Sequence, residues 1–80
     1  YEEVLVASSQ FAFSRESGTE FVVAVVNSDS EQVDLILPLH GKANWRFVDL
    51  LNPEESFTCD PSGNLQISMR PNQAMLLKNS

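Results

Sequence analysis

The stretch from Phe21 to Asn27 constrains the fold of this chain more than any other. It reads Phe-Val-Val-Ala-Val-Val-Asn, six apolar residues closed by an asparagine. A short run of Val and Phe predicts a β-strand, in which successive side chains point to opposite faces of the sheet. Antiparallel sheets in small proteins commonly bury one face and show polar side chains on the other. Because both faces of this strand are apolar, the sequence predicts a core on one side and a second apolar contact on the other.

Turn-forming residues recur every nine to twelve residues along the chain. Short runs rich in Val, Ile, Leu and Phe lie between them, and no segment shows helical spacing over the ten or so residues that a helix needs. This rhythm predicts an all-β sandwich or barrel. The turn signals are Ser17-Gly18, Ser28-Asp29-Ser30, His40-Gly41, Asn52-Pro53, Pro61-Ser62-Gly63 and Pro71-Asn72.

The expected strands follow from these boundaries. Alternation is clearest near the end of the chain, where Leu65, Ile67 and Met69 are expected to face inward and the polar residues between them outward. Asp60 to Gly63 and Asn52 to Glu55 suit type I turns, because each has proline at its second position. One domain is expected to fill residues 1–80. The expected strands are residues 3–7, 10–15, 20–27, 31–38, 45–51, 56–60, 65–70 and 73–78.

Composition excludes several classes of partner. The formal net charge is −6 and the chain has only five Lys and Arg residues, which are scattered. Binding to nucleic acid relies on basic side chains, so no nucleic-acid partner is expected. No apolar run approaches the roughly 20 residues that cross a membrane, so no membrane partner is expected either. Cys59 is the only cysteine, which excludes an internal disulfide and suits a small hydrophobic residue near a strand end.

A search for chemistry returns no catalytic, cofactor-binding or metal-binding residue. Two catalytic carboxylates must face each other across a cleft, whereas Glu2 and Glu3 point to opposite faces of a strand and Glu54 and Glu55 adjoin a turn. His40 is the only histidine and lies in an apparent loop. The acidic residues between 29 and 34 are too dispersed for a metal site. No cofactor is expected.

Two aromatic residues allow a binding role. Trp45 and Phe47 are two residues apart and share one face of their expected strand. Exposed aromatic rings can stack against sugar rings, so the pair is a candidate platform for carbohydrate. The simpler interpretation, which we favour, places both rings in the core of a small sandwich. Phe11 and Phe13 share a face in the same way and are also predicted to be core residues.

The order of these features resembles a known family. The series resembles the C-terminal β-sandwich of the α-amylase superfamily of glycoside hydrolases, and within it bacterial α-glucosidases and oligo-1,6-glucosidases are most similar. The resemblance extends from Val4 to Leu77. It is carried by Phe-Ala-Phe-Ser-Arg-Glu (11–16), Phe-Val-Val-Ala-Val-Val-Asn (21–27), Val-Asp-Leu-Ile-Leu-Pro (33–38), Trp45, Asp-Leu-Leu-Asn (49–52), Leu-Gln-Ile-Ser-Met-Arg-Pro (65–71) and Gln-Ala-Met-Leu-Leu (73–77).

The resemblance implies an antiparallel Greek-key β-sandwich of about seven or eight strands. In this family the sandwich packs against a (β/α)₈ barrel that holds the catalytic Asp, Glu and Asp, and none of these maps onto residues 1–80. The chain is therefore expected to be a non-catalytic C-terminal domain whose barrel lies N-terminal to it. The parent would be a retaining α-glycoside hydrolase acting on malto- or isomalto-oligosaccharides, so α-glucan would reach the chain through the parent.

Two alternatives stay open at this point. The first is a carbohydrate-binding module that stacks glucan on Trp45 and Phe47. The second is an immunoglobulin-like interaction domain, which rests on fold analogy alone and lacks the Cys–Trp–Cys core signature. The coverage of the apolar strand at 21–26 decides between a domain that lacks a neighbour and a self-contained one. If side chains of this chain cover both of its faces, the expectation of a neighbour fails.

Overall fold

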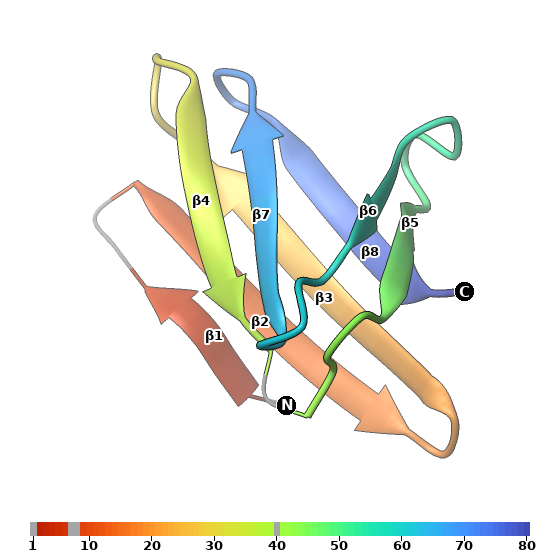
Figure 1. Cartoon of the computed structure of the whole chain (residues 1–80). Helices are drawn as coiled ribbons and strands as arrows, with labels where there is room; N and C mark the ends of the chain where they lie inside the picture. Colours follow the sequence, from red (N-terminus) through yellow and green to blue (C-terminus); the bar gives the residue numbers. More distant parts are fainter. Residues whose placement is uncertain (1, 7–8, 40) are drawn as a thin grey trace.

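The computed structural model describes residues 2–6, 9–39 and 41–80. These residues form eight β-strands (Figure 1). No helix capable of crossing a membrane occurs in this described part of the chain. The strands are β1 (Glu2–Val6), β2 (Gln10–Ser17), β3 (Glu20–Asn27), β4 (Val33–Pro38), β5 (Arg46–Asp49), β6 (Ser56–Thr58), β7 (Asn64–Met69) and β8 (Ala74–Asn79).

The strands form two antiparallel sheets of very different size. The large sheet has six strands in the order β1-β2-β3-β8-β5-β6, and the small sheet consists of β4 and β7. Figure 1 shows β4 and β7 lying together on one side of the large sheet. The chain crosses between the sheets after β3, β4, β6 and β7, so β8 lies between β3 and β5. These crossings are typical of Greek-key sandwiches, and the predicted fold class is confirmed.

The core lies between the inner face of the large sheet and the small sheet. From the large sheet, β3 contributes Phe21, Val23 and Val25, which are all buried. From the small sheet, the alternation predicted for residues 65–70 is confirmed, because Leu65, Ile67 and Met69 are buried. β4 alternates in the same way, with Leu35 and Leu37 buried and Val33 half-buried. The remaining buried apolar residues are Ala12, Leu35, Leu37, Leu39, Phe47, Cys59, Leu65, Ile67, Met69, Met75 and Leu77.

All eight expected strands are present, and their ends differ where side chains bind the backbone. The fourth strand begins at Val33 and not at 31. The preceding loop is held by the Asp29 carboxylate, which accepts a hydrogen bond from the Glu31 amide at 3.2 Å. The fifth strand ends at Asp49, because its carboxylate accepts a hydrogen bond from the Leu51 amide at 3.1 Å and turns the chain. Such local hydrogen bonds compete with strand pairing.

Turns are present at both sites predicted from proline placement. The Gly63 amide donates to the Asp60 carbonyl at 3.0 Å, and the Glu55 amide donates to the Asn52 carbonyl at 3.0 Å. Hydrogen bonds between the first and fourth residues are typical of β-turns. Gly63 has a φ of 86°, a conformation that favours glycine.

The prediction that Phe11 and Phe13 are core residues is wrong. The pairing of β2 with β3 places Phe11 opposite Val26 and Phe13 opposite Ala24. These β3 residues belong to the outer set, since Val23 and Val25 face the core. Because side chains alternate along a strand, Ala12 and Ser14 face the core, and both are buried. Phe11 is 36% exposed and Phe13 is half-buried, with ring centroids 5.3 Å apart.

Candidate interaction surface

The outer face of the large sheet is the most distinctive surface of the molecule. Val22, Ala24 and Val26 lie on the side of β3 away from β4 and β7, and all three are half-buried. Among the described residues, both strands of the small sheet lie on the opposite side (Figure 1). Among the residues that the structure describes, the neighbours of this second face of 21–26 are the side chains of β2 and β8 in the same sheet. The expectation of an apolar outer face is confirmed.

Apolar side chains extend from β3 into the neighbouring strands. One row runs from Phe11 through Val26 to Ala74. Ala24 and Leu76 form a second row, which continues to Leu50 because the Leu50 amide donates to the Leu76 carbonyl at 2.7 Å. Leu50 is 48% exposed. We name the outer patch as Phe11, Val22, Ala24, Val26, Val48, Leu50, Ala74 and Leu76.

Basic side chains border the outer patch at one end. Pairing aligns Arg15 with Val22, Val22 with Lys78, and Lys78 with Val48. Arg46 lies two residues before Val48 and therefore on the same face. Lys78 forms an ion pair with Glu20 at 3.1 Å. We name Arg15, Lys78 and Arg46 the basic row. It holds three of the five Lys and Arg residues of a chain whose net charge is −6.

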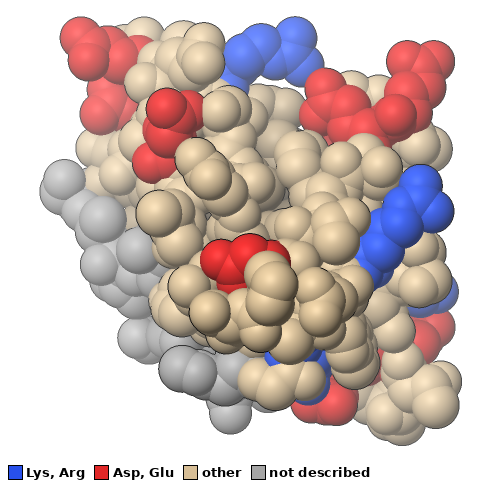
Figure 2. Space-filling view, in the orientation of Figure 1, with Lys and Arg blue, Asp and Glu red and all other residues tan. Residues whose placement is uncertain are grey.

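Acidic side chains gather elsewhere. Figure 2 views the molecule from the side of the small sheet and shows acidic groups at both upper corners, over the β3–β4 loop and the β5–β6 turn. Asp34 lies on the outer face of β4 and accepts a hydrogen bond from the Ser68 hydroxyl at 2.6 Å. Register places the cations of the basic row on the outer face of the large sheet.

Asp49 fixes the backbone that carries Leu50. Its carboxylate oxygen Oδ1 accepts hydrogen bonds from the Leu51 and Leu76 amides, both at 3.1 Å. Asp49 is 1% exposed, and no hydrogen-bond donor among the described residues reaches its second oxygen, Oδ2. Sequence reasoning assigned Asp49 no role, because nothing in the alternation of 45–51 separates a buried acid from a surface one.

The candidate carbohydrate platform is largely enclosed. Phe47 is fully buried, so its ring offers no face to a ligand. Trp45 is half-buried and lies edge-on to Phe21, with ring centroids 6.3 Å apart. The Lys42 ammonium sits 4.8 Å from the centroids of both the Trp45 and Phe21 rings, a cation–π arrangement. Core packing, the interpretation favoured from sequence, accounts for these contacts.

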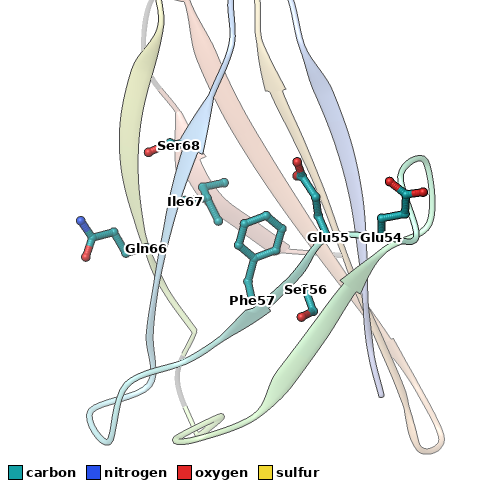
Figure 3. A pocket seen from close by; sticks show the side chains of 7 residues that line it. All are labelled: Glu54, Glu55, Ser56, Phe57, Gln66, Ile67 and Ser68. Carbon is teal, nitrogen blue, oxygen red and sulfur yellow. The ribbon is translucent and has the colours of Figure 1, made fainter.

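An open groove of about 700 Å³ lies beside β6 and β7. Figure 3 shows Phe57 and Ile67 between these two strands, with Gln66 and Ser68 turned to the other side of β7. No group of three or more His, Cys, Asp or Glu residues that could hold a metal occurs in the described part of the chain. His40 lies outside the described residues. The groove is lined by Glu54, Glu55, Ser56, Phe57, Gln66, Ile67 and Ser68.

Cys59 is buried and unreactive in character. Burial raises the pKa of its thiol, and the neighbouring Asp60 carboxylate adds to the effect. A raised pKa keeps the thiol protonated, whereas the thiolate is the nucleophile and metal ligand. Cys59 therefore serves as a small core residue, with 2% of its surface exposed.

Comparison with known proteins finds similarity in structure and not in sequence. No protein-family model matches the chain, and no curated protein matches its sequence. An α-amylase from Geobacillus thermoleovorans, solved with acarbose, matches 99% of this chain over 18% of its own, at 16% identity and a TM-score of 0.88. AmyP in complex with maltose matches 95% of this chain over 15% of its own, at 18% identity and a TM-score of 0.78.

A third solved structure agrees with these two. A candidate α-N-acetylgalactosaminidase from Bacillus halodurans C-125 matches 99% of this chain over 20% of its own, at 24% identity and a TM-score of 0.77. The chain therefore has the fold of a β-sandwich domain found in α-amylase structures, and it spans only 15 to 20% of the length of these three proteins. The resemblance indicated by the sequence is confirmed at the level of the fold.

Proposed function

We propose that this chain is a non-catalytic domain of a glycoside hydrolase of the α-amylase type. The parent enzyme cleaves α-glucosidic bonds of malto- or isomalto-oligosaccharides, and we assign it to the α-glucosidase and oligo-1,6-glucosidase type that the sequence resembles. One observation carries the proposal: the fold match covers 99% of this chain but only 18% of the Geobacillus thermoleovorans α-amylase. A domain of that size beside a much longer polypeptide is suited to a supporting role.

The role we assign to the domain is structural. It packs against a catalytic (β/α)₈ barrel that precedes it in the parent, and the outer patch is the surface available for that contact. Retaining hydrolysis needs two carboxyl groups about 5 to 5.5 Å apart, one as acid and base and the other as nucleophile. In this proposal the barrel supplies both groups, since barrel enzymes place their catalytic residues at the C-terminal ends of barrel strands.

The gene that encodes the chain provides the first test. We expect a segment of alternating strands and helices before Tyr1, with Asp and Glu at the ends of strands. The protein from the whole reading frame should hydrolyse maltotriose or isomaltose and leave the β-linked disaccharide cellobiose intact. A full-length protein that releases no glucose from either α-linked substrate would contradict the proposal.

A carbohydrate-binding module is the alternative outcome. It would slow the chain in native gels that contain starch, and replacing Trp45 by Ala would remove that retardation. The burial of Phe47 and the Lys42 ammonium against Trp45 weigh against this result. We expect the mobility of the chain to be the same with and without starch.

A further inference from the structure

We propose that the outer patch and the basic row together form one docking surface for a larger domain of the same polypeptide. The docked domain presents an apolar ridge bordered by carboxylates. This inference rests on the proposed function, which supplies the larger domain. It goes further by assigning the face that is covered and the chemistry of the surface that covers it.

The apolar part of the surface lies at the centre of the sheet. The outer patch draws on β2, β3, β8 and β5, which are the middle four strands of the six-stranded sheet. Its side chains come from aligned positions, so they form continuous rows and not scattered spots. Contiguous apolar patches on soluble proteins mark interaction sites, whereas single exposed apolar residues are common. Ile36, 61% exposed on the opposite face, is such a single residue.

Hydrogen bonds within the chain fix the backbone at the Leu50 end of the outer patch. The Leu50 amide donates to the Leu76 carbonyl at 2.7 Å, and the Asp49 carboxylate accepts from the amides on either side of that contact. A side chain on a fixed backbone loses less conformational freedom on binding. Leu50 is therefore a preorganised contact at the border of the patch.

The basic row identifies the chemistry of the partner. Lys78 is paired with Glu20 at 3.1 Å, whereas Arg15 and Arg46 form no ion pair with a described residue of the chain. Complementary charge at the rim of an apolar contact fixes orientation and suppresses wrong partners. Carboxylates facing Arg15 and Arg46 would complete the surface.

A second copy of the chain fits poorly, because two chains of charge −6 repel and an aligned pairing would oppose one basic row to another.

The test measures coverage of the patch in the full-length protein. Hydroxyl-radical labelling modifies exposed side chains, and Ile36 on the small sheet serves as an internal reference. We expect Phe11 and Leu50 to lose most of their labelling relative to Ile36, although 36% and 48% of their surfaces are exposed in the chain alone. Labelling of Phe11 and Leu50 at the level of Ile36 would overturn the proposal. Protection that disappears on dilution, together with a dimer in sedimentation, would overturn it in favour of a second copy.

A pair of matched variants tests the basic row. Arg15→Glu should raise the labelling of Phe11 and Leu50, because it brings a carboxylate against carboxylates of the partner. Arg70→Glu makes the same change of charge at an exposed position after β7 and should leave the labelling unchanged. Equal effects of the two variants would refute the assignment of partner chemistry. α-Glucan hydrolysis is measured on the same samples, so a protein that is protected but inactive would refute only the proposed function.

Discussion

Single residues that tie loops to the sheets hold this sandwich together, and Asn27 is the clearest case. It is fully buried at the end of β3. Its amide nitrogen donates to the Glu31 carbonyl at 3.1 Å and the Arg70 carbonyl at 3.0 Å. Its amide oxygen accepts from the Gln10 side chain and from the Asp29 backbone, both at 3.1 Å. One side chain thus joins the start of β2, the loop after β3 and the turn after β7.

Replacing Asn27 by Asp should be strongly destabilising despite the similar shape. The new carboxylate oxygen would face two carbonyl oxygens that lose their donor, so we expect about 3 kcal/mol or more to be lost from the free energy of unfolding. Urea denaturation measures the change. Asn72→Asp is the control, because it adds the same charge at an exposed turn residue. The deficit of Asn27→Asp should shrink at low pH, where the buried carboxyl is protonated and can donate again.

Gly63 is a second position at which the surrounding backbone determines which residue is tolerated. A Cβ atom at this position would lie 2.7 Å from the Leu39 carbonyl oxygen, and φ is 86°. Gly18 also has a positive φ, of 60°, but a Cβ there meets no atom within 4 Å. Gly18→Ala should therefore cost about 1 kcal/mol from backbone strain alone. Gly63→Ala should cost clearly more, and equal midpoints of thermal unfolding for the two variants would contradict the close contact.

At the scale of elements, the alternation of apolar residues predicted the strands well and their faces less well. Residues 33–38 and 65–70 alternate without ambiguity, so their buried sets follow from sequence alone. In β2, residues 11, 12 and 13 are all apolar, and the large rings were expected to fill the core. β2 and β3 form a hairpin in which Ser17 pairs with Glu20, and this register places Phe11 opposite Val26 and Phe13 opposite Ala24. Because both faces of β3 are apolar, alternation along the hairpin does not show which face lies toward the core.

The candidate interaction surface could likewise be predicted only in part from the sequence. The apolar second face of 21–26 is visible in the sequence, because six consecutive apolar residues allow no polar face. The basic row is not, since Arg15, Arg46 and Lys78 belong to three strands that meet only through β3 and β8. Contacts between strands that are distant in the sequence could not be predicted for this reason.

The join between β5 and β8 depends on Asp49, which leads to an element-scale prediction. Asp49→Ala removes the acceptor for the Leu51 and Leu76 amides, and we expect about 2 to 4 kcal/mol to be lost from the free energy of unfolding. Asp49→Asn keeps an oxygen at the Oδ1 position and removes a buried charge, so it should cost less. Chemical denaturation of both variants gives the order. Equal losses would show that the carboxylate charge, and not the two hydrogen bonds, matters here.

For the whole molecule, the proposed docking surface predicts different effects of one substitution in the isolated chain and in the full-length protein. Val26 lies in the centre of the row from Phe11 to Ala74, and its side chain points away from the core. We expect Val26→Lys to lower self-association of the isolated chain, because a charge on an apolar sheet face opposes contact between copies. In the full-length protein the same lysine would be buried without a partner and should cost about 3 kcal/mol of stability. Ile36→Lys, on the opposite face, should change neither property much. Sedimentation and thermal unfolding of the isolated chain, together with thermal unfolding of the full-length protein, measure these effects. A loss of stability in both proteins would show that Val26 supports the fold itself. A loss confined to the full-length protein would identify the outer face as one that another domain covers.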